Sequence, residues 1–156
     1  MKEAVIVSTA RTPIEKAYRG AFNDTQAQEM AGHAIAEAVK RSKVSKEEID
    51  DVIIGAAGQQ GSQQGNIARQ SLLRAGLPVS VAGMSLDRQC ASGMMAIATA
   101  AKEITEDGMT ITVGGGVESV SLVRNENFRM DRARDPWLEE NIPSLYMTMI
   151  ETAENV

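Results

Sequence analysis

Along the first 116 positions, short apolar runs typical of strands are separated by longer segments in which apolar residues recur at helical spacing. Between positions 27 and 39, small and apolar side chains recur every three or four residues, the spacing of one helix face. Thr25, followed three residues later by Gln28, predicts a capping box at the start of this helix. Short β-prone runs at 5–9 and 52–55 predict strands on either side of it.

The same pattern repeats further along. Ser45 with Glu48 predicts a second capping box before a single turn, and Asn66 predicts the cap of a helix that ends at Gly76. Two more strands are predicted, at 81–86 and 109–113, the second closed by Gly114-Gly115-Gly116.

Residues 91–104 are nearly all apolar or small. A helix that is apolar on all sides belongs in the interior of a structure, so we expect a central helix covered on most sides. Strands that alternate with helices predict α/β layers around a largely parallel sheet. After position 120, charged residues of both signs interrupt the periodicity. We therefore predict an α/β domain over 1–120 and the incomplete beginning of a second subdomain over 121–156.

Composition narrows the functional classes. A formal net charge of −5 disfavours nucleic acid and anionic membrane surfaces as partners, and no apolar run approaches the ~20 residues of a membrane span. One cysteine and one histidine are too few for a conventional structural zinc site, so we expect no metal. The single cysteine excludes an intramolecular disulfide and favours a reducing compartment, which predicts a cytoplasmic protein.

Cys90 lies between a predicted strand and the first turn of the apolar helix. The free N–H groups and the positive dipole end at a helix N-terminus favour an anion there, and therefore the reactive thiolate. The same N–H groups can stabilise an oxyanion on a carbonyl that the sulfur attacks. A lone cysteine can equally be a small buried hydrophobe. The pattern alone leaves nucleophile and core residue open.

Six short segments, in the same order along the chain, resemble the thiolase family of acyl-CoA acyltransferases. The most specific resembles the family's active-site segment and reads Asp87-Arg88-Gln89-Cys90-Ala91-Ser92-Gly93-Met94. The other five are Arg11-Thr12-Pro13-Ile14, Asn66-Ile67-Ala68-Arg69-Gln70, Ala75-Gly76-Leu77-Pro78, Gly115-Gly116-Val117-Glu118-Ser119 and Thr152-Ala153-Glu154-Asn155-Val156. The resemblance covers almost the whole chain and is weakest over 122–149.

The resemblance implies half of a five-layered αβαβα fold, incomplete in this chain, with a mostly parallel sheet. It implies that Cys90 takes an acyl group from a 3-ketoacyl-CoA and passes it to coenzyme A, or in reverse condenses two acyl-CoA molecules. Coenzyme A thioesters are then substrates, and no separate cofactor is expected. Family members associate, so a homodimer or homotetramer is expected at full length. We interpret Glu118 and Ser119 as holding the loop beneath the site.

Two catalytic groups of the family have no match in this sequence. Thiolases use a histidine in a Gly-His-Pro motif and a second cysteine in a Cys-x-Gly motif, both in the family's C-terminal half. His33 cannot replace the first, because it falls on the polar face of the predicted 27–39 helix, where we expect a solvated side chain. We therefore expect the chain alone to be inactive.

Other interpretations stay open. The chain is alternatively one subunit of a split enzyme, or a non-catalytic thiolase-like protein that binds a partner or carries lipid. Ketoacyl synthases and hydroxymethylglutaryl-CoA synthases share the fold and the nucleophile, although the segment around Cys90 favours thiolase. Many acetyl-CoA-specific members have Asn in place of Asp87 and His-Met-Gly in place of Thr148-Met149-Ile150. These departures favour a different or longer acyl chain.

Overall fold

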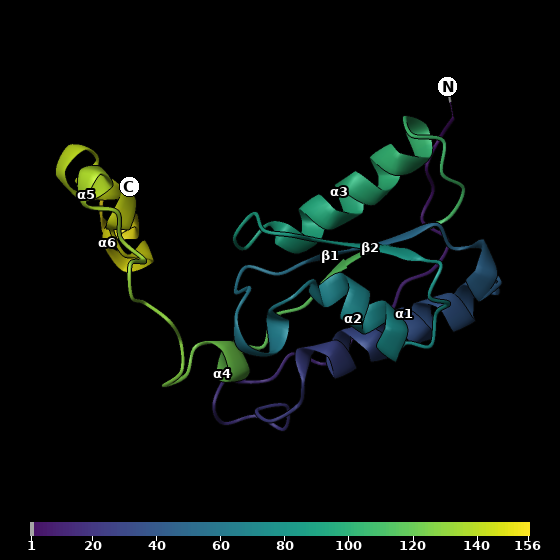
Figure 1. The fold of residues 1–156 in the computed structure, drawn as a ribbon, viewed down its shortest axis with the longest axis horizontal. Coiled ribbons are helices and arrows are strands. Elements are labelled where there is room, and N and C mark those ends of the chain that lie inside the picture. The colour runs from purple at the N-terminus through teal and green to yellow at the C-terminus, as the bar shows by residue number, and fades with distance from the viewer. Residues whose placement is uncertain (1) are drawn as a thin grey trace.

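Three layers form the body of the molecule, and a helical arm follows it (Figure 1). The computed structural model describes residues 2–156. All three strands are parallel and lie in the order β2-β1-β3, with bounds β1 (Asp51–Gly55), β2 (Ala82–Leu86) and β3 (Thr112–Gly116). One face of the sheet is covered by α1 (Ala27–Ser42) and α2 (Ile67–Arg74), and the other by α3 (Ser92–Thr105). The predicted α/β class with a parallel sheet is confirmed.

The remaining elements are short. They are the 3₁₀ helices η1 (Lys46–Glu48), η2 (Gly61–Gln63) and η3 (Pro143–Tyr146), and the α-helices α4 (Val120–Val123), α5 (Pro136–Asn141) and α6 (Met149–Glu154). None of the helices in residues 2–156 has the length and apolarity that crossing a membrane requires.

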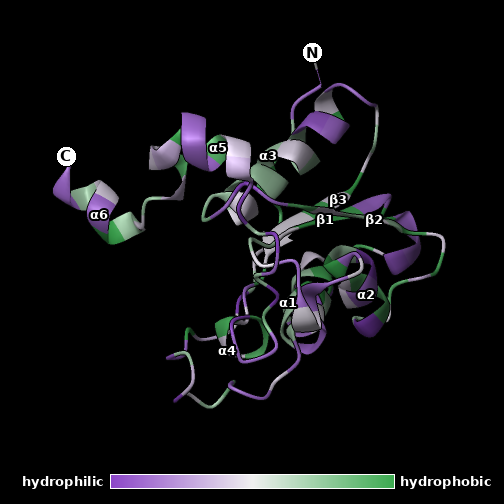
Figure 2. Ribbon diagram, turned by 60° about the vertical axis from the view of Figure 1, so that its left-hand side comes forward, coloured by the Kyte–Doolittle hydropathy of each residue, from purple (hydrophilic) through white to green (hydrophobic). Residues whose placement is uncertain are grey.

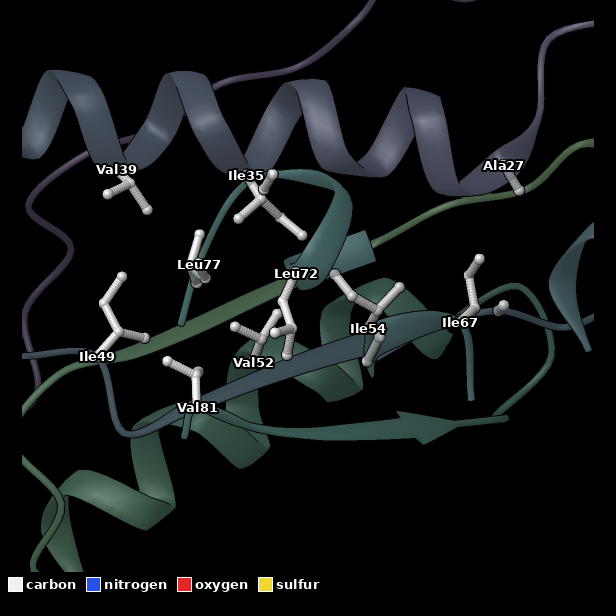
Figure 3. Packing of buried hydrophobic residues seen from close by; sticks show 13 residues of the cluster. Ala27, Ile35, Val39, Ile49, Val52, Ile54, Ile67, Leu72, Leu77 and Val81 are labelled. Atoms are coloured by element: carbon white, nitrogen blue, oxygen red, sulfur yellow. The ribbon is translucent and has the colours of Figure 1, made fainter. Parts of the chain in front are cut away.

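The main core lies between the sheet and the layer of α1 and α2 (Figure 3). All five residues of β1 are buried, because this central strand is covered on both faces. Ile35 of α1 faces Val52 and Ile54 of β1 across this core. Under α3, a smaller cluster is formed by Ile53, Ala96 and Ala100. The continuous apolar run of β1 thus serves both clusters.

Helix caps follow the sequence in two of the three predicted places. Asn66 caps α2, where its Oδ1 accepts a backbone N–H at 3.0 Å. Ser45 and Glu48 form the predicted capping box around η1. The capping box predicted at Thr25 is wrong, because α1 begins one residue later, after Gln26, whose side chain makes no capping hydrogen bond.

The strand predicted over residues 5–9 does not form. A strand needs a neighbour for its N–H and C=O groups, and this segment does not join the sheet. Side chains tie it to the body instead. Lys2 Nζ donates to the Met109 carbonyl, and Arg41 donates to the Thr9 carbonyl at 3.0 Å. Three of its large apolar side chains are exposed, those of Val5, Ile6 and Val7.

The glycine triplet belongs to β3 itself, whereas the sequence predicted that it follows the end of the strand. The pairing partners in β1 of Gly114, Gly115 and Gly116 are Ile53, Ile54 and Gly55. A Cβ on Gly114 would lie 2.8 Å from Ile97 Cα, and one on Gly116 would lie 2.9 Å from Gly93 Cα. These two glycines therefore let α3 lie close against the sheet.

Helix α3 agrees with the predicted helix to within one residue at each end, and it packs against β1 and β3. Its opposite side is open: Met94 is 77% exposed and Ile97 is 47% exposed. Within residues 2–156 the expected coverage on most sides is therefore not reached.

The arm that follows α4 contains α5, η3 and α6 and projects from the body (Figures 1 and 2). It is held together internally: Asp135 caps α5, and the Arg134 guanidinium lies 5.1 Å from the centre of the Tyr146 ring. Hydrogen bonds between Gln60 and the backbone of Arg129 join the start of the arm to the body. The domain boundary near residue 120 stays a prediction.

Candidate active site

Cys90 lies in the short loop between β2 and α3, two residues before the helix begins. Its side chain is exposed, as are the other residues of the 87–90 loop. Because β2 is parallel to its neighbour, the loop emerges at the carboxyl edge of the sheet, where α/β proteins gather their sites. Exposure argues against the interpretation of Cys90 as a core residue.

A tight turn carries the cysteine. The Gln89 N–H donates to Asp87 Oδ1 at 2.7 Å, and the Ala91 N–H donates to the Arg88 carbonyl at 3.1 Å. Gln89 has a φ of 50°, in the left-handed region that non-glycine residues enter at a cost in energy. The chain thus reverses direction immediately before Cys90.

The start of α3 rests directly on the ends of two strands. A Cβ on Gly55, the last residue of β1, would lie 2.2 Å from the backbone C and O of Ser92. The N-cap residue Ala91 offers no side chain to the first N–H groups of the helix. Their positive end therefore faces the loop that holds Cys90, an environment that favours an anion.

Glu118 and Ser119 belong to a hydrogen-bonded clamp. The Glu118 carboxylate accepts the Ala57 N–H at 2.8 Å and Gln63 Nε2 at 2.9 Å. Gln63, only 1% exposed, accepts the Ser119 N–H through its Oε1. This geometry agrees with the interpretation of Glu118 and Ser119 as loop-holding residues. Sequence reasoning missed Gln63, because nothing in a loop with four glutamines distinguishes the buried one.

His33 is exposed on α1, in the layer on the other side of the sheet from α3 (Figure 1). The sequence predicted a solvated His33 that cannot act on Cys90, and the structure places the two residues on opposite sides of the sheet. Within the described residues, no group of three or more His, Cys, Asp and Glu side chains is arranged to hold a metal ion.

Cys90 lines neither of two hollows on the described part of the chain. One, of about 320 Å³, lies between residues 10–17, α1 and the loop after β3. The other, of about 520 Å³, lies beside η2 among glutamine side chains. The cysteine lies on an exposed loop, outside both of these hollows.

Fold and site together define a parallel α/β protein with an exposed cysteine at a strand-to-helix junction. The chain matches the thiolase N-terminal domain over residues 4–149. It therefore belongs to the thiolase family, which confirms the predicted family.

Similar proteins carry thiolase names. The chain is 39% identical to the 3-ketoacyl-CoA thiolase of Bacillus subtilis (strain 168), over 100% of this chain and 39% of the relative. It is 41% identical to the 3-oxoadipyl-CoA/3-oxo-5,6-dehydrosuberyl-CoA thiolase of Escherichia coli (strain K12), over 78% of this chain and 30% of the relative. The crystal structure of the Bacillus anthracis acetyl-CoA acetyltransferase matches with a TM-score of 0.73 and 40% sequence identity. The match covers 78% of this chain and 30% of the acetyltransferase chain. The chain thus spans at most 39% of the length of these three relatives.

Proposed function

We propose that this chain provides the nucleophilic part of a thiolase site, in which Cys90 carries an acyl group between coenzyme A thioesters. One observation carries the proposal. Cys90 is exposed at the start of α3, within the region that matches the thiolase N-terminal domain. Thiolase names on the similar proteins support the substrate class, a 3-ketoacyl-CoA.

The proposed reaction has two halves. In the first, Cys90 Sγ attacks the 3-keto carbon, and the bond between C2 and C3 breaks. The electron pair leaves with the acetyl-CoA fragment, which takes up a proton, and the acyl group stays on sulfur. In the second half, the coenzyme A thiol loses its proton and attacks the acyl carbonyl, and the bond to Cys90 Sγ breaks. Run backwards, the sequence is a condensation of two acyl-CoA molecules.

The chain's own contribution is electrostatic and positional. A carbonyl attacked by Cys90 develops negative charge on its oxygen close to the N-terminus of α3, where backbone N–H groups stabilise it. The proton transfers need a base and an acid near the sulfur. Residues 1–156 contain one histidine and one cysteine, and the histidine lies on the far layer. We therefore propose that these groups come from outside this segment.

The proposal is tested by measuring the acylation of Cys90 and the catalytic turnover in separate experiments. We expect the purified chain of residues 1–156 to gain one acyl group from an activated acyl thioester, located at Cys90 by peptide mass spectrometry and absent in Cys90→Ser. With acetoacetyl-CoA and coenzyme A, no sustained loss of the enolate absorbance is expected, because nucleophile, base and acid act as a unit.

Several outcomes discriminate among the alternatives. Tight binding of an acyl-CoA or lipid without acylation would favour the non-catalytic carrier and overturn the proposal. Turnover that appears only when a separate polypeptide is added would support the split enzyme. Sustained turnover by residues 1–156 that Cys90→Ser abolishes would keep the nucleophile and show that a base within the chain was overlooked.

We also propose a homodimer or homotetramer for a full-length protein, and a cytoplasmic location. The dimer or tetramer is supported by the family to which the chain belongs. The location is supported by the single free cysteine, which a reducing compartment keeps as a thiol. Light scattering after size-exclusion chromatography measures the first, and fractionation of the source cells tests the second.

A further inference from the structure

Ser92 is the first residue of α3, and its side chain is directed away from solvent. The residue is 4% exposed, whereas all four residues of the 87–90 loop are exposed. Its hydroxyl accepts the Arg88 N–H at 2.8 Å and donates to the Gln89 carbonyl at 2.6 Å. Asp87 Oδ1 lies 3.5 Å from the same oxygen, too far to compete for the single hydroxyl hydrogen.

These contacts join the two residues that directly precede Cys90 to the buried start of the helix. Gln89 adopts a positive φ, a conformation that persists only where surrounding bonds enforce it. The Ser92 N–H adds a bond to the same Gln89 carbonyl at 3.0 Å. The buried Ser92 side chain therefore binds both residues of the turn, through the N–H of Arg88 and the carbonyl of Gln89.

Ser92 itself has no freedom to move. The close approach of Gly55 fixes its backbone against the end of β1, where even one added carbon atom would overlap it. A hydroxyl held at this point transmits the position of the sheet to the turn. Cys90 has no buried side-chain contact of its own to do so, because its side chain is exposed.

We propose that Ser92 is the positioning residue for Cys90: its hydroxyl holds the Arg88–Gln89 turn so that the sulfur stays at the N-terminus of α3. The inference rests on the proposed function, in which Cys90 is the nucleophile. Without the hydroxyl, the turn keeps its backbone hydrogen bonds but loses the bonds from the Ser92 side chain to Arg88 and Gln89. The sulfur then samples positions away from the helix end. The favourable field at the sulfur falls off within about one helical turn, so the reactivity of the thiol falls with it.

The test compares the alkylation rate of Cys90 by iodoacetamide in the folded chain and in the same chain unfolded in urea. The ratio of the two rates reports the folded environment, because the unfolded thiol has the same neighbours in sequence. We expect Ser92→Ala to lower this ratio by roughly fivefold to tenfold, the factor that corresponds to one hydrogen bond. Amide hydrogen exchange at Arg88 should also become faster, whereas that at Met95, bonded to the Ala91 carbonyl, should not.

Thr99→Ala is the matched control. Thr99 lies on the same helix, and its hydroxyl donates to the Met95 carbonyl at 2.9 Å, so the variant loses a comparable hydroxyl further from the cysteine. A residue that merely stabilises the helix would change the melting temperature and leave the rate ratio of both variants at the wild-type value. An unchanged ratio in Ser92→Ala therefore overturns the inference alone. If the wild-type chain itself reacts no faster folded than unfolded, both the inference and the assignment of Cys90 as nucleophile fail.

Discussion

Two carboxyl groups are buried in the body at the end of the sheet opposite to Cys90. Asp51 begins β1 and Glu103 lies near the end of α3, with residue exposures of 9% and 8%. Neither forms an ion pair within residues 2–156, and Glu103 Oε2 has no hydrogen-bond partner there. Burial raises the pKa of both groups, and the charge of Asp51 raises the pKa of Glu103 further.

The raised pKa values set the sign of a pH effect on stability. The folded state binds these protons more tightly than the unfolded chain, so protonation favours folding and the stability falls as pH rises through the raised pKa values. We predict that Glu103→Gln increases the free energy of unfolding at pH 7 by roughly 1 kcal/mol, because glutamine keeps the shape of the side chain and removes the buried charge. The gain should shrink as the pH is lowered toward 4.

Urea denaturation at several pH values measures this change. Glu106→Gln is the control, because Glu106 is exposed at the end of the same helix and its removal changes the interaction with the helix dipole in the same way. A pH-independent gain, equal in the two variants, would contradict a role for burial.

At the scale of elements, α3 is positioned by glycines whose neighbours are backbone atoms. Gly55 of β1 pairs with Gly116 of β3, and Gly115 is the residue before Gly116 in the same strand. The surroundings of Gly55 and Gly115 nevertheless differ. A Cβ on Gly55 would lie 2.2 Å from Ser92, whereas one on Gly115 would meet only Ile54 Cδ1 at 3.6 Å. The first contact cannot be relieved by turning a side chain, and the second is an ordinary van der Waals contact.

We predict that Gly55→Ala lowers the free energy of unfolding by about 2 kcal/mol or more, because it pushes the start of α3 off the sheet. Gly115→Ala should change it by less than about 1 kcal/mol, since alanine suits a strand better than glycine. Denaturation curves of the two variants measure the difference. Equal losses would indicate that the strand ends, and not the approach of α3, require glycine.

Local patterns predicted most elements, and the failures have physical causes. The helix ends at Ser45 and Asn66 were predictable because caps act over three residues. The strand at 5–9 failed because strand formation depends on a partner elsewhere in the chain, which β-propensity does not encode. The glycines of β3 were expected to follow the strand, because a glycine that a neighbouring helix requires cannot be distinguished in the sequence from one that ends a strand.

The candidate site divides in the same way. The position of Cys90 before a helix followed from the apolar run after it. The roles of Gln63 and Ser92 could not be predicted from the sequence, because each depends on segments that only the fold brings together. Family resemblance supplied the chemistry, which spacing and composition left open.

The whole molecule exposes apolar surface over the outer side of α3, centred on Met94 and Ile97. We predict that the chain self-associates through this side, because association removes the exposed area from water. Met94→Lys combined with Ile97→Lys should raise the concentration required for association by roughly tenfold. Sedimentation velocity over a range of concentrations measures the shift.

Val79→Lys is the control for this prediction. Val79 is 79% exposed in the loop before β2, so its variant adds a lysine without changing α3. If Val79→Lys weakens association as strongly as the double variant, charge and not the α3 surface controls it. A wild-type chain that remains monomeric at high concentration would show that this side of α3 does not mediate self-association.

The order of the strands has a consequence for how the protein is made. Asp51 at the start of β1 pairs with Ala82 on one side and Thr112 on the other, so the central strand is synthesised before either neighbour. A ribosome therefore releases the most apolar strand of the sheet long before its partners emerge. Only the helices form contacts that are local in sequence, and distant pairings are slow to form. The nascent chain thus passes through an interval in which β1 needs shielding, a task suited to chaperones that bind extended apolar segments.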